Sequence, residues 1–219
     1  MIKNYLSIAV RNIRQNPLYA FINIFSLAIG LAACLIIYLF IHDETSFDSF
    51  HNGSALIYRL DEVQTFPGTN QQKVALSMPG MGPAILKEFP EVTNYTRFQN
   101  RNKLLIIKDD KRFLLDNVAH VDSTFLTIFD FKLLAGDRAT ALNAPYSMLI
   151  TKETAIKFFG SAEKALDNTL TFREKEYKIT AILEDVPENS HMQFDVLISM
   201  TTITSEDKTF NNRWGSNFL

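Results

Sequence analysis

The 219-residue chain has a net charge of −2 and a mean hydropathy of −0.01, averages that hide a sharp division. Three of the 22 basic residues lie within residues 1–16, whereas all 24 acidic residues follow residue 42, so residues 43–219 carry a net charge of −5. This mildly acidic part excludes an electrostatic nucleic-acid interface, because such binding requires clustered lysine and arginine. The single cysteine, Cys34, excludes an intrachain disulfide, and a domain of about 175 residues can fold without one.

Residues 2–14 are predicted to form an amphipathic helix on a membrane surface. Its apolar face carries Ile2, Leu6, Ala9, Val10 and Ile13, and its polar face carries Lys3, Asn4, Ser7, Arg11 and Arg14. Such a helix lies flat with its basic residues toward anionic headgroups, so membrane lipid is a predicted partner. A helix that merely begins early is the alternative. Asn16 and Pro17 are predicted to end it, since proline breaks a helix and restricts the preceding residue.

Residues 18–41 are predicted to be a transmembrane helix. The run contains no Asp, Glu, Lys or Arg, and about 24 residues span roughly 36 Å, enough for roughly 30 Å of hydrocarbon. Basic residues precede the run, and Asp43, Glu44 and Asp48 follow it. Since positive flanks stay in the cytoplasm, the N-terminus is predicted to be cytoplasmic and residues from 43 onward extracytoplasmic.

Two processing alternatives apply to this segment. A secretory signal peptide has an apolar region of about 7–15 residues, which is shorter than this run. The tetrapeptide LAAC at 31–34 resembles the lipobox of bacterial lipoproteins, in which the cysteine is lipidated after cleavage. Apolar residues continue after Cys34, where a mature lipoprotein usually becomes polar.

Small and polar residues recur within the predicted span at intervals of three and four: Asn23, Ser26, Gly30 and Ala33. This spacing places them on one helical face, and small residues let helices approach closely. We expect this face to pack against other helices, with chance composition as the alternative.

The rest of the chain alternates predicted strands and helices. Strands are expected at 55–65 (with Leu56, Tyr58 and Leu60 on one face), 104–107, 112–118, 147–150, 169–173, 177–183 and 196–200, and helices at 84–89, 122–129 and 151–159. Asp122 and Thr151 are predicted N-caps, and Gly160 is predicted to end the last helix. The expected fold class is α+β: one transmembrane helix followed by a mixed α/β extracytoplasmic domain with βαβ units and β-hairpins.

No motif indicates an enzyme. The chain lacks G-x-x-x-x-G-K-[ST], G-x-G-x-x-G and G-x-S-x-G. His42, Asp43 and Glu44 could ligate a metal, but a polar collar beside the membrane is the preferred interpretation. Asn189, Ser190 and His191 are neighbours in a turn-rich stretch, and neighbours in sequence do not make a catalytic triad. We therefore predict no catalytic residue, cofactor or metal site.

Five segments, in order along the chain, resemble a known family. They are NIRQNP at 12–17, DExSFDxFH at 43–51 with IYRL at 57–60, FxFxLLxGD at 129–137, ITKExAxKFFG at 150–160, and DxPxNSHxxFD at 185–195. Together they resemble the N-terminal part of a MacB/FtsX-type ABC transporter permease: the first transmembrane helix and a MacB-like periplasmic core domain. Each segment is modestly specific, whereas five in order are strongly so.

The resemblance implies a permease in the inner membrane without its own ATPase site. It implies as partners a separate ABC ATPase subunit, a second permease copy, and a periplasmic adaptor or substrate. The expected parts are a cytoplasmic amphipathic helix at 1–16, the transmembrane helix at 17–42, and the periplasmic core domain at 43–219. Permeases of this family have further membrane helices after that domain, so we expect a truncated chain with an incomplete C-terminus.

Three other readings compete with this one. A single-span sensor or receptor would carry a ligand domain outside the membrane, and a lipoprotein would be anchored at Cys34. An extracytoplasmic enzyme would require a cluster of polar residues that the sequence does not reveal. The transported substrate is not indicated by any residue.

Overall fold

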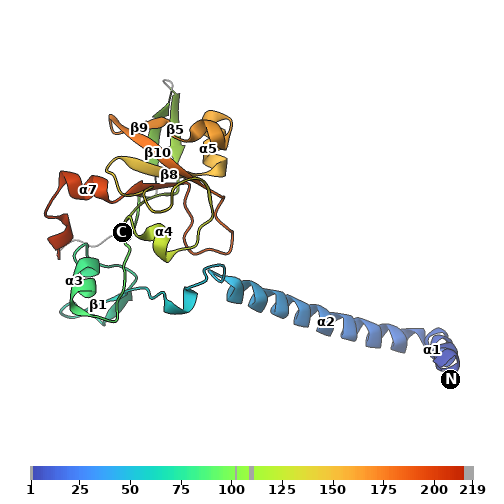
Figure 1. Cartoon of the computed structure of the whole chain (residues 1–219). Coiled ribbons are helices and arrows are strands. Elements are labelled where there is room, and N and C mark those ends of the chain that lie inside the picture. Colours follow the sequence, from blue (N-terminus) through green and yellow to red (C-terminus); the bar gives the residue numbers. More distant parts are fainter. Residues whose placement is uncertain (1, 102, 109–110, 215–219) are drawn as a thin grey trace. The chain divides into compact units, whose positions relative to one another are not determined.

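A computed structural model describes residues 2–101, 103–108 and 111–214. The chain divides into two compact units, Met1–Phe47 and Asp48–Leu219. The first unit consists of helix α1 (Ile2–Gln15) and helix α2 (Pro17–Ser46), which are separated at Asn16 as predicted (Figure 1). Among the described residues, α2 is the one helix long and apolar enough to cross a membrane. It continues past the predicted limit at residue 42, where hydroxyls of its last turn hydrogen-bond to carbonyls of the preceding turn.

The described part of the second unit contains one large sheet and one small sheet. The large sheet is built from β3 (Phe98–Asn100), β4 (Leu104–Lys108), β5 (Lys111–Leu115), β6 (Val118–Val121), β7 (Leu133–Gly136), β8 (Ser147–Thr151), β9 (Thr169–Phe172), β10 (Lys175–Leu183) and β11 (Val196–Ser199). The small sheet pairs β1 (Glu62–Gln64) with β2 (Gln72–Val74). The helices of this unit are α3 (Met81–Glu88), α4 (Phe125–Ile128), α5 (Lys152–Phe159), α6 (Ala162–Ala165) and α7 (Thr201–Glu206).

The topology confirms the predicted fold class. Strands β8 and β10 are parallel and are connected through α5, which makes a βαβ unit. Hairpins β4–β5 and β9–β10 extend the same sheet (Figure 1). The strand order is β3-β6-β11-β8-β10-β9-β4-β5, with β7 paired to β10.

This order requires the sheet to curl. Three residues separate β3 from β4 in the chain, although five strands lie between them in the sheet. A flat sheet would place these strands about 29 Å apart at about 4.8 Å per strand, whereas the connecting chain reaches at most about 14 Å. The two ends of the sheet therefore approach each other. Leu104 and Leu115 accordingly share one buried cluster with Val118 and Ile198 from the other end.

Two apolar cores lie on opposite faces of the sheet. The concave core contains side chains of β4, β5, β8 and β10 and is covered by α5 and α6. The second core contains Phe125, Phe131 and Phe194 and is covered by α4. The strands alternate between these cores because successive side chains point to opposite faces. Both faces of the central strands are thereby buried.

Two predicted strands are corrected by the structure. Residues 55–61 are not a strand: Ser54–Leu56 is a 3₁₀ turn, pairing begins only at β1, and Leu56 and Tyr58 are 82% and 85% exposed. Apolar side chains alternate along this segment, but no neighbouring strand pairs with it, and an unpaired strand is not stable. Residues 112–118 are not one strand, because β5 ends at Leu115 and β6 begins at Val118. A polar turn at 108–111 is expected between the strands at 104–107 and 112–118; residues 108 and 111 lie in β4 and β5, and residues 109 and 110 lie outside the described residues.

Asp122 does not cap the helix that follows it. That helix is only α4, its N-cap residue is Thr124, and it ends before Phe129. The Asp122 carboxylate instead accepts two hydrogen bonds from the Arg97 guanidinium, at 2.6 and 2.8 Å. A charged partner outcompetes a capping interaction, since hydrogen bonds between charged groups are roughly twice as strong as neutral ones.

The caps predicted for α5 are confirmed. Thr151 Oγ1 accepts a hydrogen bond from the Thr154 amide at 3.4 Å, which satisfies a free donor of the first turn. Gly160 has φ of +83° and its amide donates to the Ile156 carbonyl at 2.8 Å. This left-handed position suits glycine, which has no Cβ to clash.

Candidate functional site: the stem joint

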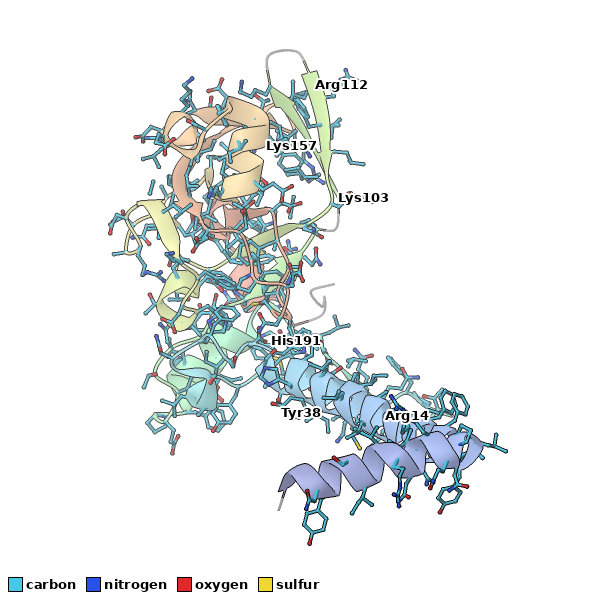
Figure 2. The ribbon with its side chains drawn as sticks, turned by 90° about the vertical axis from the view of Figure 1, so that its right-hand side faces the viewer. Arg14, Tyr38, Lys103, Arg112, Lys157 and His191 are labelled. Carbon is cyan, nitrogen blue, oxygen red and sulfur yellow. The ribbon has the colours of Figure 1, made fainter. Side chains whose placement is uncertain are left out.

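The chain enters the second unit at Asp48, whose carboxylate binds a loop far away in sequence. The Ser190 hydroxyl and the His191 amide each donate to Asp48 Oδ1 at 3.1 Å. His191 Nδ1 lies 2.8 Å from Asp48 Oδ2, and the Asp48 amide donates to the Asn189 carbonyl at 2.9 Å. Figure 2 labels His191 on this loop. We call residues 48–52, with the 129–131 and 189–191 segments that contact them, the stem joint.

The residue type at position 48 fits its backbone. Asp48 has φ of +53°, a left-handed conformation that aspartate tolerates better than most residues. Burial alone would raise the pKa of Asp48, but hydrogen bonds from His191 and Ser190 outweigh it and hold the pKa below its ordinary value of 3.8. The carboxylate is therefore charged at neutral pH and serves as an acceptor for the loop.

His51 anchors the joint in the apolar core. Its side chain is 3% exposed and its ring lies 4.0 Å from that of Phe50 and 5.1 Å from those of Phe129 and Phe131, between ring centroids. Its Nδ1 accepts a hydrogen bond from the Asp130 amide at 3.0 Å. The chain is thus fixed by one polar and several aromatic contacts within four residues of Asp48.

The protonation of His51 follows from this geometry. Because Nδ1 accepts a hydrogen bond, the neutral ring carries its proton on Nε2. Nε2 is buried and has no hydrogen-bond partner among the described residues. Burial lowers the pKa of His51, although Asp48 and Asp130 act in the opposite direction. A buried N–H without a partner costs about 1–3 kcal/mol, and nothing in the described contacts explains why this cost is retained.

The segment that receives His51 is itself rigid. Arg138 donates hydrogen bonds to the carbonyls of Leu126, Phe129 and Phe131. Gly136 has φ of +93°, and a Cβ there would lie 2.4 Å from the Thr180 carbonyl oxygen. Only glycine permits β7 to approach β10 this closely. The FxFxLLxGD segment at 129–137 is therefore held in a fixed conformation where it contacts His51.

The loop that binds Asp48 is also tied to the sheet. The Asp185 carboxylate accepts a hydrogen bond from the Glu153 amide at 2.8 Å, in the first turn of α5. The Gln193 side chain donates to the carbonyls of Pro187 and Ser190, each at 2.9 Å. Four of the five segments that carried the family resemblance, at 43–51, 129–137, 150–160 and 185–195, thus contact one another, directly or through this loop. These contacts could not be predicted from the sequence, because the segments are far apart along the chain.

The predicted helix-packing residues lie in the other unit. Asn23, Ser26, Gly30 and Ala33 are exposed along α2, and a Cβ at Gly30 would meet no atom within 4 Å. Ser26 Oγ donates to the Ile22 carbonyl of its own helix at 2.7 Å. Their packing against other helices stays a prediction. Within the described residues, no group of three or more His, Cys, Asp or Glu side chains is placed to hold a metal.

The sequence analysis did not predict one buried polar cluster, which is centred on Arg97. Arg97 is 7% exposed, and besides Asp122 it donates to the Pro79 carbonyl at 2.9 Å and to Asn211 Oδ1 at 2.8 Å. Its guanidinium lies 5.6 Å from the Phe210 ring centroid. Arg97 therefore connects the 210–212 turn and the residue before Gly80, at the start of α3, to the sheet. No local pattern signals such a contact, because its partners are 18 to 114 positions away.

A helix long and apolar enough to cross a membrane precedes a mixed α/β domain, and the comparisons with known proteins identify the family of the chain. Residues 20–218 match the family model of the MacB-like periplasmic core domain, so the chain belongs to this family. The resemblance to MacB/FtsX-type permeases is thereby confirmed. Comparison with curated protein sequences finds no match.

The comparison with solved structures finds similar domains. A domain of a Porphyromonas gingivalis protein described as a permease is 27% identical, with a TM-score of 0.60 over 72% of this chain and 66% of that one. The periplasmic region of MacB from Actinobacillus actinomycetemcomitans is 12% identical, with a TM-score of 0.45 over 63% and 59%. The extracellular domain of the ABC-type transporter YknZ from Gram-positive bacteria is 12% identical, with a TM-score of 0.44 over 57% and 64%. The chain thus spans 66% or less of each structure's length.

Proposed function

We propose that this chain is part of an ABC transporter permease that couples ATP hydrolysis by a separate ATPase to export or other work outside the inner membrane. The observation that carries the proposal is the family match over residues 20–218, which begins within the apolar helix α2. A soluble extracytoplasmic domain would not need this helix. A second permease copy and a periplasmic adaptor or substrate are the further partners that the resemblance implies.

The proposed orientation rests on charge. The basic residues of α1 precede the apolar run, and Asp43 and Glu44 end it. By the positive-inside rule, α1 lies on the cytoplasmic leaflet and Asp48–Leu219 lies outside. α1 is then placed where an ATPase acts, and α2 connects it to the stem joint.

The stem joint is the place where we expect movement of α2 to act on the second unit. Helix α2 ends at Ser46, and Asp48 is already bonded to the 189–191 loop. His51, three residues after Asp48, is buried in the core of the second unit. The start of the second unit is therefore held to its own loop and core, and we propose that movement of α2 would act on the second unit at this point.

The test of the function is recovery of the ATPase. The full-length gene product would be tagged, extracted from its native membrane in a mild detergent and analysed by mass spectrometry. The expected result is an ABC ATPase subunit that co-purifies, with ATP hydrolysis in the eluate. Recovery of a signalling protein without an ATPase would contradict the proposal and favour the sensor. A chain that begins at a diacylated Cys34 would contradict it and favour the lipoprotein.

The orientation can be tested with cysteine labelling, because Cys34 is the single cysteine. In a Cys34→Ala background, Asn4→Cys and Glu91→Cys place one thiol in each unit at exposed positions. A membrane-impermeant maleimide applied to intact cells with a permeabilised outer layer should label position 91 and not position 4. Labelling of position 4 alone would reverse the orientation.

A further inference from the structure

The part of the second unit that follows the stem joint exposes large apolar side chains. Leu56 and Tyr58 are 82% and 85% exposed, and Leu60 is 42% exposed. The most exposed large apolar side chain of α2 is Leu18, at 73%. Two side chains of the second unit are thus more open than any of the helix that is apolar enough to face lipid. We call residues 54–61 the entry segment.

The exposed side chains of the entry segment occupy alternate positions. Ile57 has an extended backbone, with φ of −96° and ψ of 122°, so its neighbours Leu56 and Tyr58 point to the same side. Ile57 points to the other side and is half-buried. Tyrosine carries a polar hydroxyl on an apolar ring, and for this reason it is enriched where a membrane meets water.

The entry segment has no net charge. Arg59 and Asp61 are its two charged residues, and Arg59 Nε lies 2.8 Å from Asp61 Oδ1. Both side chains are exposed, at 74% and 47%, so the ion pair can remain in water. Attraction of this segment to a lipid surface would therefore depend on apolar contact and not on anionic headgroups.

The backbone of the entry segment limits the depth at which it can lie in a bilayer. Among the described contacts, no backbone hydrogen bond involves residues 58–61, and strand pairing begins at Glu62. Unpaired N–H and C=O groups are excluded from hydrocarbon, because no water is present there to bond them. In the headgroup layer water can bond them, while the side chains extend toward the acyl chains.

The fold keeps the entry segment close to the stem joint. The His51 amide donates to the Asp48 carbonyl at 3.2 Å, the Ser54 amide to the His51 carbonyl at 3.1 Å, and the Ile57 amide to the Ser54 carbonyl at 3.2 Å. A turn of this kind spans less than about 7 Å, so three of them place Ile57 within about 21 Å of Asp48. One residue separates Asp48 from the end of α2.

We propose that the entry segment lies in the headgroup layer of the membrane beside the second unit, with Leu56, Tyr58 and Leu60 against the acyl chains. Lipid is the occupant that fits this apolar side, because the segment follows the membrane helix closely, carries no net charge and has an unpaired backbone. The inference rests on the proposed insertion of α2 in the membrane. A unit held both at the stem joint and at the entry segment cannot rotate freely about α2.

The test uses tryptophan fluorescence of the full chain reconstituted in phosphatidylcholine vesicles. Trp214 is the single tryptophan, so Trp214→Phe gives a silent background. Tyr58→Trp, Leu114→Trp and Leu31→Trp then place one reporter each at exposed positions of the entry segment, β5 and α2. In Figure 1, β5 and residues 54–61 lie at opposite ends of the second unit. Bromine on the acyl chains, near the headgroups or near the chain ends, quenches the indole at shallow or deep positions.

Shallow bromine should quench Tyr58→Trp at least about threefold more than Leu114→Trp. Deep bromine should quench Leu31→Trp, which reports insertion of α2 independently. Equal quenching at positions 58 and 114, with quenching at position 31 retained, overturns the proposal and leaves α2 in the membrane. This result is also the one expected if a protein, and not lipid, covers the entry segment. Loss of quenching at position 31 overturns the insertion of α2 and the proposal with it.

A pair of serine variants tests the apolar contact itself. In the Tyr58→Trp chain, Leu56→Ser with Leu60→Ser should reduce the quenching by shallow bromine by at least about half. Leu105→Ser with Leu114→Ser, on the β4–β5 hairpin, should leave it unchanged. All four side chains are exposed, so folding is retained. An equal effect of the two pairs would contradict the proposal.

Discussion

Asp48 and His191 lie 143 positions apart, yet Asp48 Oδ2 and His191 Nδ1 are 2.8 Å apart. The contact joins the residue that begins the second unit to the loop after β10. The His191 side chain is 70% exposed, so the contact between its ring and the carboxylate contributes little in water. The His191 amide and the Ser190 hydroxyl donate two further hydrogen bonds to the same carboxylate, each at 3.1 Å. The structural role of Asp48 therefore rests on the set of hydrogen bonds.

Asp48→Asn should loosen the stem joint without changing its backbone, because asparagine also tolerates the left-handed region. We expect the free energy of unfolding to fall by about 1 kcal/mol through loss of a charged acceptor. Amide hydrogen exchange at His191 should accelerate, since its N–H donates to Asp48. Asp43→Asn, on the exposed surface of α2, is the control. Unchanged exchange at His191 would show that the carboxylate is dispensable.

His120 should make the domain less stable in mild acid. The unfolded chain takes up this proton near pH 6.5, whereas the folded domain does so only near pH 4. Stability is thus fully present above pH 6.5 and falls as the pH drops toward 4, by about 2 kcal/mol between pH 7 and pH 5. The lowered pKa of His51 acts in the same direction.

His120→Gln should flatten this dependence, whereas His42→Gln, at an exposed position on α2, should not. Guanidinium unfolding in detergent at pH 7 and pH 5, followed by circular dichroism, measures both. An equally steep loss in His120→Gln would mean that other groups govern it.

Arg97→Met should be among the most destabilising substitutions in the domain. It leaves the Asp122 carboxylate, 13% exposed at its side chain, without its charged partner. Loss of one partner of a buried pair costs about 3–5 kcal/mol. The double variant Arg97→Met with Asp122→Leu should recover part of this loss, because no unpaired charge remains. A double variant as unstable as the single one would place the cost in the lost contacts to Pro79 and Asn211.

Gly136→Ala should destabilise the domain by about 2–3 kcal/mol, since the backbone conformation is left-handed and the added Cβ meets backbone atoms of β10. Gly53→Ala is a matched control, because a Cβ at Gly53 has no atom within 4 Å and its φ is −96°. The control should change stability by no more than about 0.5 kcal/mol. Equal midpoints of thermal unfolding for the two variants would refute the close approach of β7 to β10.

Gly30→Ile should weaken assembly in the membrane if the stripe of small residues packs against another helix. Ala28→Ile enlarges a residue on the opposite face of α2 and should have little effect. We expect about fivefold less co-purifying permease copy, equivalent to about 1 kcal/mol of helix packing. Differently tagged copies in one membrane give the measurement. Equal recovery with both variants would leave the stripe without a packing role.

Local patterns predicted much of this fold. The break at Asn16 and Pro17, the caps of α5, the β9–β10 hairpin and β11 depend on residues near each other in sequence, and all are present. The family segments were also recognisable, because each is a short local pattern. Where local signals failed, a distant partner had decided the outcome: Asp122 binds Arg97 rather than capping α4, and residues 55–61 have no strand to pair with.

The sequence by itself determined the apolar run, the charge asymmetry around it and the order of strands and helices, because hydrophobicity and periodicity act over a few residues. Only the tertiary structure decided which of these elements meet. It placed His191 on Asp48, enclosed His51 among phenylalanines of another segment, and curled the sheet until Leu104 and Val118 shared one core. The physical reason is that such contacts depend on strand order and chain closure, and neither is encoded in the spacing of any single segment.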